Sequence, residues 1–430
     1  MLKVFKLKNG LTVFLNPEEN HRLVAIYFVI RAGSEYETKD KNGTAHFLEH
    51  MYFKGSKNFP SAKELHYALE KHGAYVNAVT SYEATLFYAI VPPRNLKFIL
   101  EVFADILKNP LFPQEEIDKE RNVIIEELNM YEDDPKRKIT DYAYETIFGD
   151  QPAGWPIGGT KETLQQISRQ DLINFYNKNY SSLNTALIIS GAFEITQNLI
   201  KSISELLSDY KKIKPASKPR AIFNPGFKIN IYPNSKINQA HLAISFSEVF
   251  NKLPSIQKRI NITHLATILG VGLSSRLFHI LREELGVAYY TYTYFDVYPE
   301  RYIFSIYAGV DLNKVQISVE KILTMLSDCK EKGFLNEELI KSKNILEASL
   351  IGNLETSANT ASRIAESFIL KEKLFPIKTL LNFIRKTDLG DLKKAANELF
   401  NYSKSSLVLI YPEDNQILKN ELRKHFAEKL

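Results

Sequence analysis

Two stretches of this 430-residue chain, LFPQEEIDKERNVIIEEL (residues 111–128) and GFLNEELIKSKNILEASL (residues 333–350), decide its fold. Aligned without gaps, they match almost position for position, and their apolar residues recur at the spacing of an amphipathic helix. A single match of this kind between two amphipathic helices carries little weight, because chance can produce it. The segments around the two helices therefore have to show whether the chain contains a duplication.

The segments around both helices recur in the same order. The strand pattern AHLAISFS (240–247) echoes VAIYFVI (24–30), and LFHILREELGVAYYTYTYF (277–295) echoes YALEKHGAYVNAVTSY (67–82). Recurrence of a whole series of elements favours duplication over chance. We therefore expect an α+β protein with two domains of similar fold, each a mostly antiparallel sheet packed against helices.

The boundary between the domains is predicted from composition. Residues 209–227, DYKKIKPASKPRAIFNPGF, combine three prolines with a run of basic residues, which is typical of a linker. We expect an N-terminal domain over residues 1–210, a linker over 211–227 and a C-terminal domain over 228–430. The length of the chain fits two domains of about 200 residues each.

The elements of the first domain follow from its hydrophobic periodicity. Residues 3–15, KVFKL–KNG–LTVFL, predict a β-hairpin. Ser61 and Glu64 form a capping box for a helix over 61–73, and Gly73 ends that helix. The other periodic segments predict a strand over 24–33, a pair of strands over 74–92, helices over 94–108 and 114–132, and a strand over 185–192.

Composition narrows the classes of partner. The net charge is +5, but the basic residues are scattered, so we expect no nucleic-acid partner. The single Cys329 rules out an intrachain disulfide and fits a reducing compartment. No run approaches the ~20 apolar residues of a membrane span, and the N-terminus lacks a signal-peptide pattern. We expect a cytoplasmic protein without membrane contact.

The segment TAHFLEHMYFKGS, residues 44–56, contains the first chemical motif. His46 and His50 are four residues apart, so on a helix they lie on the same face, and Glu49 flanks them. This arrangement suits a metal ion with a carboxylate next to it. The alternative is a pair of ordinary surface histidines beside a solvated acid. A metal site also needs a third ligand from elsewhere in the chain.

The acidic helix over residues 114–132 offers that ligand. Glu120 and Glu127 are seven residues apart and share one face. The buried side of this helix is marked by apolar residues, which are Val123, Ile124 and Leu128. A carboxylate beside a buried side needs a partner or a metal. Glu126 competes with Glu127 for this role, and a solvated acidic face is the alternative for the whole helix.

The duplication bears on the same acids. In the gap-free alignment Glu120 faces Ser342, and Glu127 faces Ser349. The second copy also has no counterpart of HFLEH. We expect that one copy holds a polar site and that the other does not.

Together these motifs resemble the pitrilysin/insulinase metallopeptidases. The pattern H-x-x-E-H is the inverted zinc motif of the inverzincins, and ERNVIIEEL follows with its second Glu 77 residues after His50. The resemblance extends over most of the chain. Within the family, the sequence most resembles the branch that contains the mitochondrial processing peptidase β-subunit and its bacterial relatives. Its other segments are KNGLTVFL (8–15), AGSEYE (32–37), AYVNAVTSYEATLFY (74–88), GDQPAGWPIGGT (149–160) and GVGLSSRLFHILREELGVAY (270–289).

The resemblance implies a zinc endopeptidase or oligopeptidase that hydrolyses unfolded or short peptides in a closed chamber. The implied zinc ligands, for one ion per chain, are His46, His50 and Glu127. Glu49 is the implied general base, and Glu120 is a second acid that supports the site. The resemblance also implies that the substrate backbone binds along a strand edge at Asn77 and Ala78.

The second domain matches the family at Arg282 and Tyr289, a pair that reaches the substrate from the far wall of the chamber. Because the chain is about half as long as single-chain members, the resemblance implies a homodimer. A heterodimer with an inactive paralogue and a non-catalytic scaffold or peptide-binding subunit are the alternatives. Relatives that process presequences read a substrate arginine with an acidic pair, which corresponds here to Arg137 and Asp141, so we expect no strict arginine requirement.

Overall fold

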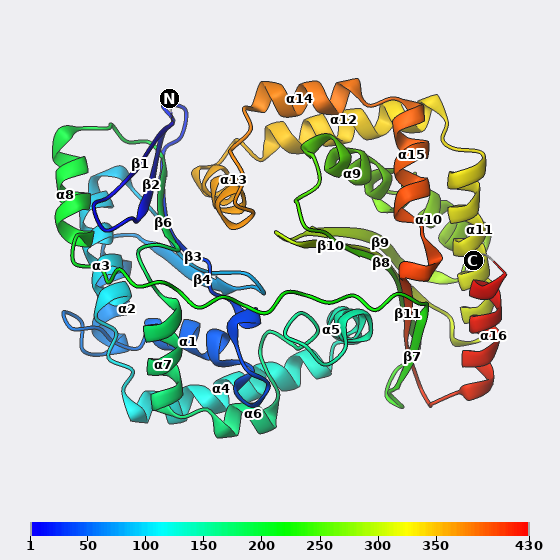
Figure 1. The fold of residues 1–430 in the computed structure, drawn as a ribbon, viewed down its shortest axis with the longest axis horizontal. Coiled ribbons are helices and arrows are strands. Elements are labelled where there is room, and N and C mark those ends of the chain that lie inside the picture. The colour runs from blue at the N-terminus through cyan, green and yellow to red at the C-terminus, as the bar shows by residue number, and fades with distance from the viewer. Residues whose placement is uncertain (1, 429–430) are drawn as a thin grey trace. The chain divides into compact units, whose positions relative to one another are not determined.

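The computed structural model describes residues 2–428, which form two compact units (Figure 1). The first unit comprises residues up to Asn129, Pro156–Pro219 and Ile351–Leu374. The second unit comprises Met130–Trp155, Arg220–Leu350 and the residues from Phe375 onwards. None of the described helices has the length and apolar composition needed to cross a lipid bilayer.

The first unit contains a six-stranded sheet with the order β1-β2-β6-β3-β5-β4. All neighbouring strands are antiparallel except β2 and β6, which are parallel. The predicted N-terminal hairpin is confirmed as β1 and β2, and β4 forms one edge. The strands are β1 (Lys3–Lys6), β2 (Thr12–Pro17), β3 (Val24–Ile30), β4 (Tyr75–Thr80), β5 (Thr85–Val91) and β6 (Thr185–Gly191).

The second unit contains a five-stranded sheet with the order β7-β11-β8-β10-β9. Only β7 and β11 are parallel. Without β1, the first sheet has the same order and the same single parallel pair, so the predicted duplication and α+β class are confirmed. The strands are β7 (Lys228–Pro233), β8 (Ala240–Val249), β9 (Ala288–Val297), β10 (Arg301–Val310) and β11 (Ser405–Tyr411).

Several helices of the first unit contact its sheet directly, and others pack on those helices. The capping box predicted for α2 is present, because Ser61 accepts the backbone N–H of Glu64 and Glu64 accepts that of Ser61. The longer helices of this unit are α1 (Thr44–Tyr52), α2 (Ala62–Lys71), α3 (Leu96–Lys108), α4 (Gln114–Glu132, whose last turn belongs to the second unit), α6 (Lys161–Gln166), α7 (Arg169–Asn179), α8 (Gln197–Leu207) and α13 (Ser357–Ile369).

The helices of the second unit repeat this order. After β8 come α9 and the short α10, where the first unit has α1 and α2, and α10 continues into a π-helix over His279–Glu284. The other helices of this unit are α5 (Pro135–Phe148), α9 (Ile256–Gly270), α10 (Arg276–Phe278), α11 (Val315–Glu331), α12 (Asn336–Gly352), α14 (Ile377–Lys386), α15 (Leu389–Leu399) and α16 (Gln416–Ala427).

Each sheet is covered on one face by a helix from the other half of the sequence. Strand β3 is buried throughout, with alternate residues in two separate apolar clusters. The cluster on its second face includes Ala361 and Ile364 of α13. In the second unit Ile139 and Ala143 of α5 pack against strands β8, β10 and β11. The ranges 1–210 and 228–430 thus contain one sheet each. Helix α13, from the second range, belongs to the first unit, and α5, from the first range, belongs to the second unit.

Candidate metal centre

Helix α1 carries the HFLEH motif, and the side chain of Glu37 binds the backbone at its start. Gly43 adopts a left-handed φ of +98° before the helix, and no side chain caps it from the usual N-cap position. Instead the Glu37 carboxylate accepts the backbone N–H groups of Gly43 (2.8 Å) and Ala45 (2.6 Å) and the amide of Asn42 (2.9 Å). Glu37 therefore satisfies donors that the first helical turn leaves free, and it fixes the start of the helix.

Three donor groups converge between α1 and α4. One nitrogen each from His46 and His50 and one carboxylate oxygen of Glu127 lie within 4.8 Å of one another. Glu127 Oε2 is 3.5 Å from His50 Nε2 and 3.8 Å from His46 Nε2. Ligands of one tetrahedral zinc ion lie about 3.3 Å apart, given zinc–ligand bonds near 2 Å. The donor types and their spacing therefore fit zinc.

The second nitrogen of His50 is held by Glu120. His50 Nδ1 lies 3.0 Å from Glu120 Oε2, and Lys54 Nζ contacts the other oxygen of the same carboxylate. Such a carboxylate behind a metal-binding histidine orients the ring and makes Nε2 a better ligand. His46 Nδ1, in contrast, is buried without a hydrogen-bond partner among the described residues.

The protonation states of the two histidines differ. Burial lowers the pKa of His46 to about 4, so this ring is neutral at pH 7, as a metal ligand must be. Burial also acts on His50, but its hydrogen bonds to Glu120 and Glu127 prevail and raise its pKa to about 9. Without a metal, His50 thus carries a proton between two acids, and a bound cation would take over that role.

Glu49 lies beside the three donors without belonging to them. Its carboxylate oxygen Oε2 accepts the hydroxyl of Thr80 at 2.6 Å. Burial raises the pKa of Glu49 above its ordinary value, while the Thr80 contact and the charge of His50 oppose that shift. A half-buried carboxylate next to a metal position is suited to accept and return a proton.

Glu126 does not belong to this group of three donors. Its side chain is exposed and accepts the Asn129 amide at 3.3 Å. The interpretation of Val123 as part of the buried side was wrong, because it is 50% exposed. Ile124 is fully buried as predicted, and Leu128 packs at the edge of the core.

Asn77 and Ala78 lie in the edge strand β4, as predicted from the resemblance. The side chains of β4 alternate between exposed and buried, with Asn77 exposed and Ala78 buried towards α1. No strand pairs with the other edge of β4, where the Ala78 N–H donates to Asn77 Oδ1 at 2.8 Å, so an added strand would have to displace the Asn77 side chain.

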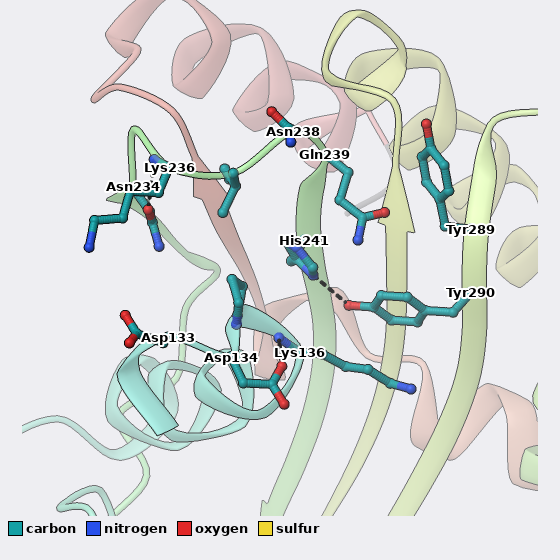
Figure 2. Close-up of a pocket in the computed structure, with 12 residues that line it drawn as sticks. Asp133, Asp134, Lys136, Asn234, Lys236, Asn238, Gln239, His241, Tyr289 and Tyr290 are labelled. Atoms are coloured by element: carbon teal, nitrogen blue, oxygen red, sulfur yellow. Dashed lines mark hydrogen bonds between the residues drawn. The ribbon is translucent and has the colours of Figure 1, made fainter. Parts of the chain in front are cut away.

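Arg282 contacts the backbone next to Tyr289 in the second unit. Arg282 lies in the π-helix and donates a hydrogen bond to the carbonyl of Ala288, directly before Tyr289 in β9. Tyr289 is 63% exposed and lines a cavity of about 590 Å³ between the start of α5 and the β7–β8 turn (Figure 2). In the same cavity His241 Nδ1 lies 2.9 Å from the Tyr290 hydroxyl.

The positions matched to an arginine-reading pair do not form an acidic site. Arg137 is exposed and pairs with Asp134 at 3.5 Å. Asp141 lies 3.7 Å from the ammonium group of Lys138.

The second unit retains one histidine at the matching helix contact. His264 of α9 pairs through Nδ1 with the hydroxyl of Ser342 in α12 at 2.8 Å. Ser342 is the residue that the sequence alignment sets against Glu120, which holds His50 in the first unit. The acid is replaced by serine, and no three-donor group occurs around His264 among the described residues.

Sequence reasoning missed three residues of the site, namely Glu37, Lys54 and Thr80. Thr80 and Lys54 contact acids that are remote in sequence, Glu49 and Glu120, and Glu37 contacts the start of α1 from the loop before it. Helical spacing does not reveal Lys54 either, because α1 ends at Tyr52 and Lys54 lies beyond it.

Comparison with known proteins places these residues in a family context. Residues 12–161, which include all three donors, match the family described as insulinase (peptidase family M16). Residues 166–346, which include Arg282 and Tyr289, match one described as the peptidase M16 inactive domain.

Curated relatives match over nearly the whole chain. A Bacillus subtilis protein named uncharacterized zinc protease YmxG is 32% identical over 417 residues, covering 96% of this chain and 99% of its own. A Rickettsia felis protein named uncharacterized zinc protease is 31% identical over 411 residues, covering 96% and 98%. The crystal structure of a protease from Helicobacter pylori has the same fold, with a TM-score of 0.88, 23% identity and coverage of 96% of this chain and 99% of that one.

Proposed function

Since this chain belongs to the insulinase family of peptidases, family M16, we propose that it is a zinc-dependent endopeptidase or oligopeptidase acting on unfolded or short peptides. The observation that carries the proposal is the convergence of His46, His50 and Glu127 with Glu49 alongside. Two imidazoles and one carboxylate leave a fourth zinc position open, as a catalytic site requires.

Each residue of the candidate site in the first unit has a separate role in the proposed reaction. His46, His50 and Glu127 would hold one zinc ion per chain, which supplies a more acidic water and a polarised scissile carbonyl. Glu49 accepts the proton of the attacking water and returns it to the nitrogen of the leaving amine. Glu120 keeps the His50 ring oriented through Nδ1.

The substrate would bind as an added strand. The free edge of β4, at Asn77 and Ala78, would supply backbone hydrogen bonds that are largely independent of side-chain sequence, once the Asn77 side chain releases the Ala78 N–H. Such binding selects extended segments over folded proteins. Because Arg137 and Asp141 do not form an acidic pair, cleavage does not require a basic residue near the scissile bond.

We also propose that the active enzyme is a homodimer in which Arg282 and Tyr289 of one chain complete the site of the other. Their adjacency in the second unit and the exposure of Tyr289 support a joint contact with substrate. A heterodimer with a paralogue is the alternative assembly.

The match of residues 166–346 to the inactive domain of the family favours one second candidate, a non-catalytic scaffold or peptide-binding subunit. The complete donor set with a carboxylate beside it favours the catalytic function.

Metal analysis and peptide cleavage test the proposed function together. The purified chain should bind about one zinc ion and cleave an unstructured peptide. Glu127→Ala should lose both zinc and activity, and the neighbouring Glu126→Ala is the matched control that should keep both. Glu49→Gln should retain zinc and lose about 100-fold or more in kcat, because it removes the base but no ligand. A chain that binds zinc yet cleaves no peptide would support the scaffold or heterodimer instead.

A further inference from the structure

Strand β4 has two relations to the candidate site. Its free edge is where the peptide would pair, and its last residue, Thr80, reaches the carboxylate of Glu49 in α1. Side chains of a strand alternate between faces, so Thr80 shares with Ala78 the face that packs on α1. One short segment therefore contacts both the expected substrate backbone and the expected base.

The contact between Thr80 and Glu49 is a side-chain hydrogen bond. The hydroxyl of Thr80 donates to Glu49 Oε2 at 2.6 Å. A glutamate side chain has three rotatable bonds, and a free one in the open mouth of a site samples several orientations. The short hydrogen bond from the Thr80 hydroxyl favours the orientation of Glu49 seen here.

Thr80 is itself held firmly by the turn that follows it. It pairs across the β4–β5 hairpin with Thr85, and the Ser81 N–H donates to the Ala84 carbonyl at 2.8 Å. The Ser34 N–H donates to the Ser81 carbonyl at 3.1 Å. The next residues of the turn lead to the buried Glu83, which pairs with Lys218 at 2.6 Å.

From this geometry we infer that Thr80 is a positioning residue for the general base: its hydroxyl holds the Glu49 carboxylate in the orientation needed for proton transfer. The inference rests on the proposed peptidase function. Because Thr80 ends the strand that would bind the peptide, the same strand sets the position of the substrate and of the base. Catalytic groups held in this way lose little free energy to reorientation during the reaction.

Two substitutions and one control isolate the hydroxyl. Thr80→Val keeps the shape and removes the hydroxyl, whereas Thr80→Ser keeps the hydroxyl. Thr85→Val is the matched control, because Thr85 is the cross-strand partner and donates to the Ala32 carbonyl at 2.9 Å instead of to Glu49. Melting temperature and zinc content are measured for all three variants.

Thr80→Val should lower kcat by about 10- to 100-fold with KM and zinc content within twofold of wild type. Thr80→Ser should stay within about threefold of the wild-type kcat, and Thr85→Val should not lower kcat beyond the same limit. In a Glu49→Gln background Thr80→Val should change the residual kcat less than twofold, because the two residues act through one contact. Full kcat in Thr80→Val, equal losses in the Ser and Val variants, or an equal loss in Thr85→Val would overturn the inference.

Crystal structures of the metal-free wild type and Thr80→Val provide a readout that does not depend on activity. The wild type should show one Glu49 orientation, bonded to Thr80, and the variant should show a displaced or multiple one. An unchanged Glu49 in the variant contradicts the inference. If the zinc-loaded wild type cleaves no peptide, the proposed function fails, and the crystal structures still decide whether Thr80 positions Glu49.

Discussion

At the scale of single residues, some members of the candidate site could be predicted from the sequence and others could not. His46 and His50 could be predicted because they share a helical face over one turn, a purely local relation. The choice of Glu127 over Glu126 needed the family resemblance, because α4 has acids on both sides and even Val123 is half exposed. Thr80 and Glu37 could not be predicted, since their contacts depend on how a strand and a loop pack on α1.

The series of contacts from Lys54 to Glu120 and from Glu120 to His50 predicts an effect on metal affinity. Lys54→Met removes the cation that holds one oxygen of Glu120, so this carboxylate no longer orients the His50 ring firmly. Zinc affinity should fall about 10-fold, as for other partners behind metal ligands. Competition with a chelating dye measures this change. Lys57→Met, at an exposed position three residues later, is the control, and equal affinities in both variants would refute the role of Lys54.

At the scale of elements, the periodicity of the sequence predicted several of the strands and helices but not all of their packing. The continuous apolar run VAIYFVI indicates a strand covered on both faces. The sequence does not show that α13, more than 300 residues later, provides the second cover. The same holds for α5, because helical periodicity identifies an apolar face without identifying the sheet it packs on.

The contact between α9 and α12 predicts a pH dependence of stability. Burial lowers the pKa of His264 in the folded protein to about 4, compared with 6.5 in the unfolded chain. Below pH 6.5 the unfolded chain binds a proton that the folded protein excludes, so stability is lost as the pH falls. The loss at pH 5 relative to pH 7.5 should be about 2 kcal/mol.

Urea unfolding of the wild type and of His264→Gln at both pH values measures this contribution. The glutamine variant keeps a polar group near Ser342 and cannot be protonated, so its stability should fall less between pH 7.5 and pH 5. A parallel fall in both proteins would assign the acid sensitivity to other groups.

At the scale of the whole molecule, the duplication separates two sets of functional residues. The unit with the three donors also contains Glu49 and the β4 edge. Arg282 and Tyr289 belong to the other unit. There α9 and α12, which correspond to α1 and α4, place His264 against Ser342. A duplicated fold that has kept different residues in its two copies is suited to combining them between chains. This division motivates the proposed homodimer with sites completed in trans.

Mixing two inactive variants tests this assembly. A Glu49→Gln chain and an Arg282→Ala/Tyr289→Phe chain should each be nearly inactive as homodimers. After subunit exchange, a mixed dimer contains one site with intact Glu49 from one chain and intact Arg282 and Tyr289 from the other, while its second site carries both defects. Random pairing makes half of the dimers mixed, so about a quarter of wild-type activity should return.

Two controls make the mixing experiment decisive. Differently tagged chains show by co-purification that exchange has taken place, and a Tyr294→Phe chain, altered at another exposed tyrosine of β9, should be active as its own homodimer, before any mixing. Recovered activity requires that each variant supplies what the other lacks, which only sites shared between chains allow. If exchange is proven and activity does not return, the sites are completed within one chain, or Arg282 and Tyr289 do not act in catalysis.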